Sequence, residues 1–407
     1  MRQIISFIAS GFGPAKYELA VSIGYLILPV IFIRVLVGVF ISALNAYNVF
    51  VRVTLLPLII SIAGVVTLLY SDDIHLLKNM CLAFTVSYII YGVTLAVMTR
   101  TYIPWGFRFN RISPIFWEIL RYSSVQLFCM AISQFALFVE RRSASYFPDG
   151  TIASLNYAYN LAGQFVFIIV FSLFGIMQRQ LAVKISQKDM SSAIDEFWKI
   201  LSYIMYIVAF SVAVFVVLRL PILQILYERK SFDYAAVQRT AQPFLLYSIW
   251  ILGQTVMLSA TALILAAKEW KILIICNIIA YGLDICLVGY FARWFGYLGI
   301  AGSALFAVTC YATLLIIGSR RIFGRTYFHG LSSIFKIFLA GAIAALGMEF
   351  VYSILLFTGW QQLEHAGLKI VIVGVCGIAF YILSSILLKV NYANMIRIKI
   401  TQYILRY

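Results

Sequence analysis

Residues 17–44 read YELAVSIGYLILPVIFIRVLVGVFISAL, an apolar run with only two charged side chains, Glu18 and Arg34. A helix needs about 20 apolar residues to cross roughly 30 Å of hydrocarbon, so this run is long enough to span a membrane. Ten further apolar stretches follow it, at 54–70, 79–98, 123–139, 151–174, 200–218, 244–266, 272–291, 298–318, 334–357 and 368–388. The sequence therefore predicts an all-α integral membrane protein with about eleven transmembrane helices.

The composition excludes a soluble fold. Hydrophobic residues make up 63% of the chain, charged residues 11%, and the mean hydropathy is +0.97, whereas soluble domains carry about 25% charged residues. A transmembrane β-barrel would show shorter segments of alternating hydrophobicity. The net charge of +16 could suggest nucleic acid, but the basic residues lie in short loops between apolar stretches, where they act as topology signals. We expect no nucleic-acid partner.

The basic residues are concentrated on one side of the membrane. One set of alternate loops holds most of them, including Arg100, Lys184 and Arg320, and this set also contains the C-terminal segment. Cytoplasmic loops carry an excess of Lys and Arg, so the C-terminus is expected in the cytoplasm and the N-terminus outside. The first residues do not resemble a secretory signal. We therefore expect that one or more helices are missing upstream.

Enzymatic chemistry has little support in the sequence. There is no phosphate-binding GxxxxGK loop, no metal-ligand spacing and no cofactor motif, and His75, His329 and His365 lie in separate loops. The six cysteines fall inside predicted helices without a disulfide or metal pattern. A membrane glycosyltransferase would need acidic residues in a sizeable outer loop. The adjacent pair Asp72 and Asp73 sits in a short one.

Ionisable residues inside the apolar stretches are the first candidate site residues, because a charge in hydrocarbon is costly unless it faces a cavity or a partner. Arg34 follows the helix-kinking Pro29, and either contacts an anion in a cavity or bonds to a neighbouring helix. Asp284 lies near the centre of its stretch, so its partner is a cavity, a cation, a proton or a neighbouring helix. Glu140 lies near a helix end, beside arginines that snorkelling explains.

A polar stripe runs along the stretch TIASLNYAYNLAGQFVF. Asn156, Asn160 and Gln164 are four residues apart, and this spacing places them on one face of a helix. Such a stripe either lines a cavity or joins two helices by hydrogen bonds.

Four segments occur in an order that is typical of one family. They are ASGFGPAKYELAVSIGYLILPVIFIRVLVGVFISALNAYNVF at 9–50, ERRSASYFPDGTIASLNYAYNLAGQFVF at 140–167, QILYERKSFDYAAVQRTAQPFLLYS at 224–248 and LDICLVGYFARWFGYLGIAGSALFAVTCYATLL at 283–315. In this order they resemble the MviN/MurJ family of lipid II flippases. The likeness extends roughly over residues 11–320 and is most specific from Glu140 onward.

The resemblance implies the two-lobed flippase/exporter fold of the multidrug/oligosaccharidyl-lipid/polysaccharide exporter superfamily, with a cavity that opens alternately to either side. In the family's register this chain lacks the first three helices, so its N-terminal lobe is incomplete. We expect a partial N-lobe of three helices over 1–112 and a C-lobe of six helices over 113–320. An extra helical hairpin over 321–390 and a basic cytoplasmic tail over 391–407 complete the prediction.

The resemblance also implies a function. Family members move an undecaprenyl-pyrophosphate-linked cell-wall precursor across the bacterial inner membrane, so we expect a flippase that works by alternating access on a lipid-linked oligosaccharide among membrane lipids. A Na⁺ or H⁺ gradient or the membrane potential would supply the energy, without a cofactor. The alternatives are a polysaccharide-unit or multidrug exporter of the same superfamily and a truncated remnant without transport activity. The sequence gives no oligomer signal.

Site roles follow from the same resemblance. Family members hold the pyrophosphate with arginines, whose forked donors match phosphate oxygens. One of those arginines corresponds to Asn160 here, and the others belong to helices that this chain lacks. Glu140 and Asp284 match positions on helices that form a sodium site in some relatives, which makes them candidates for cation coupling. The remaining candidates are assigned to substrate binding: Arg34, Asn156, Asn160 and Gln164.

Overall fold

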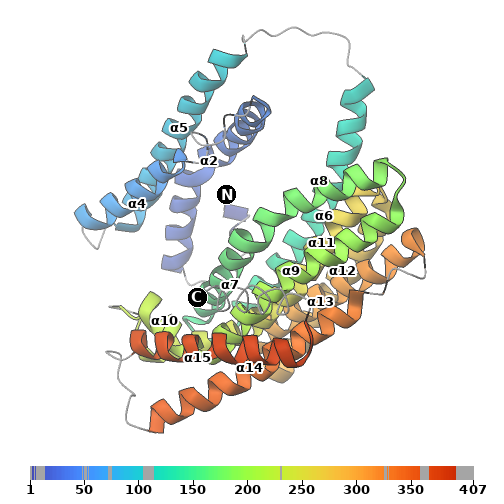
Figure 1. Cartoon of the computed structure of the whole chain (residues 1–407). Helices are drawn as coiled ribbons and strands as arrows, with labels where there is room; N and C mark the ends of the chain where they lie inside the picture. The colour runs from blue at the N-terminus through green and yellow to red at the C-terminus, as the bar shows by residue number, and fades with distance from the viewer. Residues whose placement is uncertain are drawn as a thin grey trace, which may run out of the picture. The chain divides into compact units, whose positions relative to one another are not determined.

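The computed structural model describes residues 2–3, 5, 14–47, 49, 53, 55–71, 76–103, 114–229, 232–324, 328, 330–357 and 366–390 (Figure 1). Within these ranges the chain is helical apart from short connections and one isolated bridge between Arg229 and Phe232. It divides into two compact units, Met1–Glu118 and Ile119–Tyr407. The domain boundaries predicted from the sequence stay predictions, and the predicted tail over 391–407 lies outside the described residues.

Ten helices in the described ranges are long and apolar enough to cross a membrane, which confirms the all-α membrane class. These helices are Tyr17–Leu44, Leu76–Tyr102, Ser123–Ala144, Thr151–Ser186, Met190–Val217, Tyr234–Ala266, Trp270–Phe295, Tyr297–Phe323, Leu331–Phe357 and Ala366–Leu387. The stretch predicted at 54–70 is helical over Leu58–Tyr70, directly after Pro57. Its 13 residues reach about 20 Å, short of the roughly 30 Å of a full span.

In the described part of the unit Met1–Glu118, three helices with continuous described ranges pack together. They are α2 (Pro14–Ala46), α4 (Leu58–Tyr70) and α5 (Leu76–Tyr102). Helix α5 packs against both others. A Cβ on Gly92 of α5 would lie 3.0 Å from the Ile33 side chain of α2, so the missing side chain permits this close approach. The Thr85 hydroxyl donates to the Leu26 carbonyl across the same contact, at 2.9 Å.

The unit Ile119–Tyr407 is built around helix α11. Its helices are α6 (Pro114–Ala144, entered at Ile119), α7 (Thr151–Phe165), the π-helical turn η1 (Val166–Phe171), α8 (Ser172–Ser186), α9 (Met190–Val217), α10 (Arg219–Tyr227), α11 (Tyr234–Ala266), α12 (Trp270–Phe295), α13 (Tyr297–Phe323), α14 (Leu331–Phe357) and α15 (Ala366–Leu387). Helix α11 packs against α7, α8, α9, α10 and α13 (Figure 1).

Three hydroxyl side chains buried along α11 form hydrogen bonds within the helix itself. The hydroxyls of Thr240, Ser248 and Thr255 donate to the carbonyls four residues earlier, at 2.8, 2.7 and 2.8 Å. An unpaired hydroxyl in an apolar interior costs free energy, so these bonds let α11 occupy the centre of the unit.

Helices α12 and α13 form a tight hairpin with a single connecting residue. Gly296 has φ +60° and ψ −148°, a backbone region that is essentially restricted to glycine. A Cβ on Gly299 would lie 1.9 Å from the Phe291 carbonyl oxygen. The two glycines therefore hold α13 close against α12 from the turn onward.

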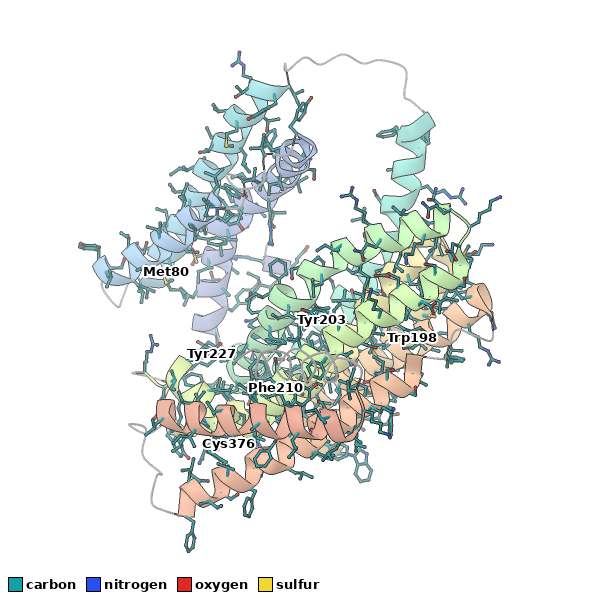
Figure 2. All side chains as sticks on the ribbon, viewed as in Figure 1. Met80, Trp198, Tyr203, Phe210, Tyr227 and Cys376 are labelled. Atoms are coloured by element: carbon teal, nitrogen blue, oxygen red, sulfur yellow. The ribbon has the colours of Figure 1, made fainter. Side chains whose placement is uncertain are left out.

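Helices α14 and α15 pack on each other, and α14 also packs on α9. A Cβ on Gly347 of α14 would lie 2.8 Å from the Phe380 ring of α15, and the Tyr381 hydroxyl donates to the Tyr206 carbonyl at 2.7 Å. Figure 2 draws the side chains of these helices, with Phe210 and Cys376 labelled. Large apolar side chains such as Phe357, which is 93% exposed, suit a surface that faces lipid.

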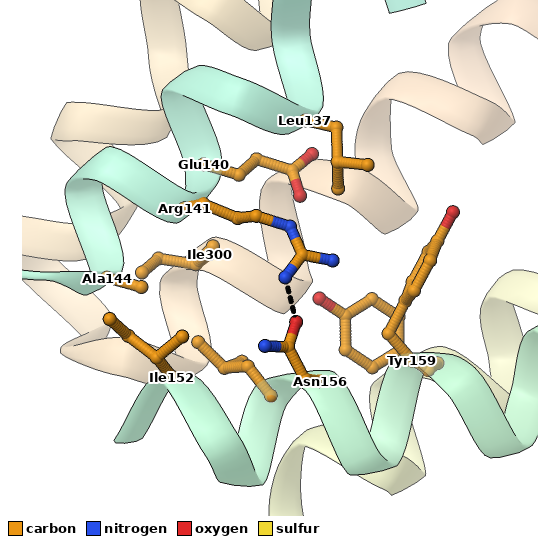
Figure 3. A pocket seen from close by; sticks show the side chains of 10 residues that line it. Leu137, Glu140, Arg141, Ala144, Ile152, Asn156, Tyr159 and Ile300 are labelled. Atoms are coloured by element: carbon orange, nitrogen blue, oxygen red, sulfur yellow. Dashed lines mark hydrogen bonds between the residues drawn. The ribbon is translucent and has the colours of Figure 1, made fainter. Parts of the chain in front are cut away.

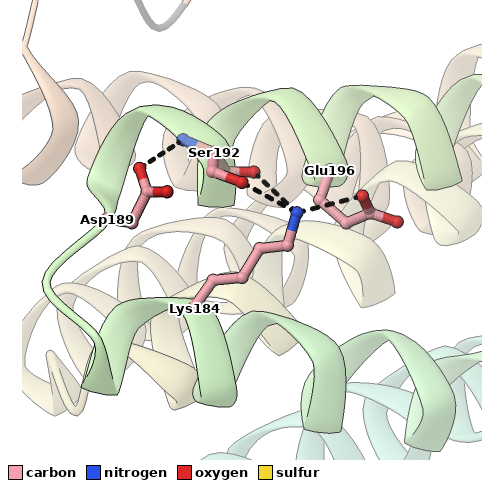
Figure 4. Close-up of polar contacts among 4 residues, drawn as sticks. All are labelled: Lys184, Asp189, Ser192 and Glu196. Atoms are coloured by element: carbon pink, nitrogen blue, oxygen red, sulfur yellow. Dashed lines mark hydrogen bonds and ion pairs between the residues drawn. The ribbon is translucent and has the colours of Figure 1, made fainter.

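The start of α9 is capped by a side chain (Figure 4). Asp189 Oδ1 accepts from the backbone N–H of Ser192 and from the Ser191 hydroxyl, both at 3.0 Å. The hydrogen bond from the Ser192 N–H lowers the pKa of Asp189 below its ordinary value of 3.8. Lys184 of α8 crosses the same turn and pairs with Glu196 at 3.2 Å. These contacts fix the connection between α8 and α9.

The glycine contact in the α12–α13 hairpin can be tested with Gly299→Ala. The added methyl group has no room beside the Phe291 carbonyl, so the hairpin must open, and overpacking of this kind costs about 1–3 kcal/mol. Gly302→Ala is the matched control, because its Cβ would meet the Phe291 ring at an ordinary 3.5 Å. We expect the thermal unfolding midpoint in detergent to fall clearly for Gly299→Ala and little for Gly302→Ala. Equal midpoints would contradict this packing.

Candidate functional site

Two carboxyl groups meet inside the unit Ile119–Tyr407. Glu140 comes from α6 and Asp284 from α12, and they are 7% and 1% exposed. Their side chains are close enough to interact with each other. Both oxygens of Asp284 are buried and have no hydrogen-bond partner among the described residues. A buried carboxyl group without partners is costly, which marks this position as a site.

Ser303 of α13 lies beside Asp284. Its hydroxyl donates to the Ile300 carbonyl at 3.0 Å. The hydroxyl proton is therefore used within α13, and the lone pairs of the Ser303 oxygen stay available to accept a hydrogen bond or bind a cation. The α12–α13 hairpin is what holds Ser303 next to Asp284.

A cavity of about 190 Å³ opens beside this pair. Its lining comes from five helices and consists of Ser133, Gln134, Leu137, Glu140, Tyr159, Trp250, Gln254, Tyr281, Asp284, Ala304 and Val308. The side-chain oxygen Oε1 of Gln254 is also buried without a hydrogen-bond partner in the described structure. The volume suits a small ion with a few water molecules and is too small for a lipid-linked sugar.

A second, smaller cavity of about 20 Å³ lies on another side of Glu140 (Figure 3). It has room for about one water molecule. Arg141, Asn156 and Tyr159 contribute to its lining, and an Nη1 N–H of Arg141 donates to the Asn156 side-chain oxygen. Glu140 lines both cavities, so it is a wall that the two cavities share.

The chemistry of the site favours a small cation. The buried atoms that lack partners around the larger cavity are oxygens of Asp284 and Gln254, which can accept hydrogen bonds or bind a hard cation but cannot bind an anion. No group of three or more His, Cys, Asp or Glu residues with metal-binding geometry occurs among the described residues. Two carboxyl groups with neutral oxygens suit a monovalent cation or a proton.

The structure brings some of the predicted site residues together and leaves others apart. Glu140 and Asp284, from helices far apart in the sequence, form one site, and their coupling role stays a prediction. Asn156 is half-buried and is engaged by Arg141, whereas Asn160 and Gln164 are exposed along the same helix α7. Arg34 is exposed on α2, in the other unit. The substrate-binding roles of these four residues also stay predictions.

Three residues of the site were not predicted from the sequence. Arg141 was explained as an interfacial side chain, but it is half-buried and faces Glu140 and Asn156 (Figure 3). Its position next to Glu140 in the sequence was the feature that could have indicated a place in the site. Nothing in the sequence distinguished Gln254 or Ser303, because polar residues of this kind are common in membrane helices.

Comparisons with known proteins place the chain. The sequence model of the family described as "Lipid II flippase MurJ" matches residues 1–370. Among solved structures, "Lipid II flippase MurJ, inward closed conformation" is similar with a TM-score of 0.74 and 20% sequence identity, over 97% of this chain and 79% of that one. Comparison with curated proteins gives no significant match.

The family match extends over most of the 407 residues, and the structural similarity extends over nearly all of them. The predicted flippase fold and the predicted family are therefore confirmed, and the family is one of transporters and not of enzymes. With its ten apolar helices, this multi-pass membrane protein belongs to the lipid II flippase MurJ family.

Proposed function

We propose that this protein translocates an undecaprenyl-pyrophosphate-linked cell-wall precursor, lipid II or a close analogue, across the bacterial inner membrane by alternating access. The family match over residues 1–370 is the observation that carries this proposal. Ten apolar helices within the described ranges support a carrier that works inside the bilayer. The C-terminus is proposed to lie in the cytoplasm, because the more basic set of loops includes it.

Arg34 is the residue proposed to bind the charged part of the substrate. It is exposed on α2, in the apolar part of the helix that follows Glu18. A guanidinium group can bind two phosphate oxygens at once. A charge left in hydrocarbon without a partner is costly, and a pyrophosphate group would supply one. Asn156, Asn160 and Gln164 of α7 are proposed to offer neutral hydrogen bonds to the sugar part of the head group.

Glu140 and Asp284 are proposed to bind a coupling cation, either Na⁺ or H⁺. The unpartnered oxygens of Asp284 and Gln254 surround a cavity that suits a small cation, and the same carboxyl pair accepts a proton. The membrane potential adds to the driving force, because moving one elementary charge across 100 mV is worth about 2.3 kcal/mol. Binding in one conformation and release in the other would couple this energy to the substrate.

Complementation tests the flippase function. We expect the wild-type gene to restore growth of bacteria that have been depleted of their own lipid II flippase. Arg34→Ala should impair this rescue far more than Leu36→Ala, a nearby exposed position on the same helix, because only Arg34 can neutralise a pyrophosphate. Membrane levels are compared by immunoblot. No rescue by a wild-type protein that reaches the membrane would contradict the flippase function, and equal effects of the two substitutions would contradict the role of Arg34.

Cation binding is tested on the purified protein by replacing either carboxyl group with its amide. We expect Na⁺ to raise the thermal unfolding midpoint of the wild type at constant ionic strength, because a cation that binds only the folded state stabilises it. Glu140→Gln and Asp284→Asn should each abolish this rise, since each removes one charged ligand. Glu349→Gln, on α14 outside the cavity lining, is the control and should keep it. A rise that persists in both site variants would contradict the proposed cation site.

A further inference from the structure

Arg141 occupies an unusual position beside the carboxyl pair. It directly follows Glu140 on α6, its side chain is half-buried, and it interacts electrostatically with Glu140, Tyr159 and Tyr247. An arginine keeps its positive charge at all physiological pH values. A permanent positive charge therefore lies next to the site that is proposed to bind a cation.

Among the described residues, the guanidinium group has one hydrogen-bond partner, and that partner is neutral. An Nη1 N–H of Arg141 donates to the side-chain oxygen of Asn156 on α7 (Figure 3). Arg141, Asn156 and Glu140 all line the same cavity of about 20 Å³. The arginine thus has two competing attractions in one small space, the Asn156 amide oxygen and the Glu140 carboxylate, and the structure shows it bonded to the first.

From this geometry we propose that Arg141 is a built-in competitor of the coupling cation, a positioning residue whose guanidinium moves between Asn156 and Glu140. This inference rests on the proposed cation coupling and specifies how that site is regulated. With the site empty, the guanidinium turns toward Glu140 and compensates its charge. A cation bound between Glu140 and Asp284 repels the guanidinium, and Asn156 holds it aside.

Such a competitor serves transport by giving the empty site a counter-charge. Two buried carboxylates with neither a cation nor a proton would repel each other in a medium of low dielectric constant. This repulsion would raise the free energy that the empty carrier needs to change conformation. Arg141 compensates part of this charge when the cation leaves. When the guanidinium turns to Glu140, its bond from α6 to Asn156 of α7 is broken, so cation occupancy changes how α6 is attached to α7.

The proposal predicts effects of opposite sign from two neighbouring residues. Arg141→Gln removes the competitor, so Na⁺ should bind about tenfold more tightly, as expected for removing a like charge several ångströms away. Asn156→Leu removes the partner that holds the guanidinium aside, so Arg141 should compete better and Na⁺ should bind more weakly. The double variant should bind Na⁺ like Arg141→Gln, because Asn156 affects Na⁺ binding only through Arg141.

The experiment measures the Na⁺ concentration that gives half of the rise in thermal unfolding midpoint, with N-methyl-D-glucamine keeping the ionic strength constant. This concentration is compared within each variant, so a change in overall stability does not affect it. Arg142→Gln is the matched control, because Arg142 is the neighbouring arginine and is exposed outside the cavity lining. It should bind Na⁺ like the wild type.

The possible results separate this inference from the function on which it rests. A wild type without any Na⁺ response would overturn Na⁺ coupling at this site and this inference together, whereas the flippase function is tested separately by complementation. A wild-type response that Arg141→Gln leaves unchanged or weakens would overturn the competitor role alone. An additive double variant would overturn the part assigned to Asn156.

Discussion

The pair of carboxyl groups from Glu140 and Asp284 is the constraint on which the site depends. Placing them together inside an apolar bundle is costly, and the cost is acceptable only if a cation, a proton or a nearby positive charge compensates it. The surrounding structure supplies parts of this compensation. The cavity beside the pair is lined in part by oxygen-bearing side chains, and Arg141 lines the smaller cavity next to Glu140. The packing of these helices and the chemistry of the site therefore both depend on compensating the charge of the two carboxyl groups.

Helix α6 is attached to its unit by a narrow stripe. Among its described residues, the buried ones are Cys129, Ala136, Glu140 and Ala144, and three of these four side chains are small. Helices α11 and α13, by contrast, bury many more of their residues. Close contacts at Gly253 join α11 to α13, and close contacts at Gly299 join α13 to α12. On the proposed account, the rigid helices keep Asp284 and Ser303 in place, and the charge state of the site acts on the weakly attached α6.

Much of the fold could be predicted from the sequence because hydrocarbon imposes long apolar stretches, and their ends are marked by charged loops. Leu58–Tyr70 was expected to be a longer span, since hydropathy does not show that Pro57 marks the start of the helix. Glu140 and Asp284 could be found because a charge in an apolar stretch is conspicuous. Their meeting could not be derived from local pattern, because it depends on how α6 packs near α12. Arg141 was missed for the same reason: a helix-end arginine looks identical in sequence whether it faces lipid headgroups or a buried carboxylate.

Flipping in proteoliposomes under an imposed ion gradient tests the central claim most directly. The purified protein is reconstituted with a fluorescent undecaprenyl-pyrophosphate-linked precursor, and the fraction of precursor in each leaflet is followed after a Na⁺ or H⁺ gradient is imposed. The account predicts that one of the two gradients accelerates net flipping, and that an ionophore for that ion removes the acceleration. Flipping that proceeds at the same rate with and without both gradients would contradict a cation-coupled site at Glu140 and Asp284.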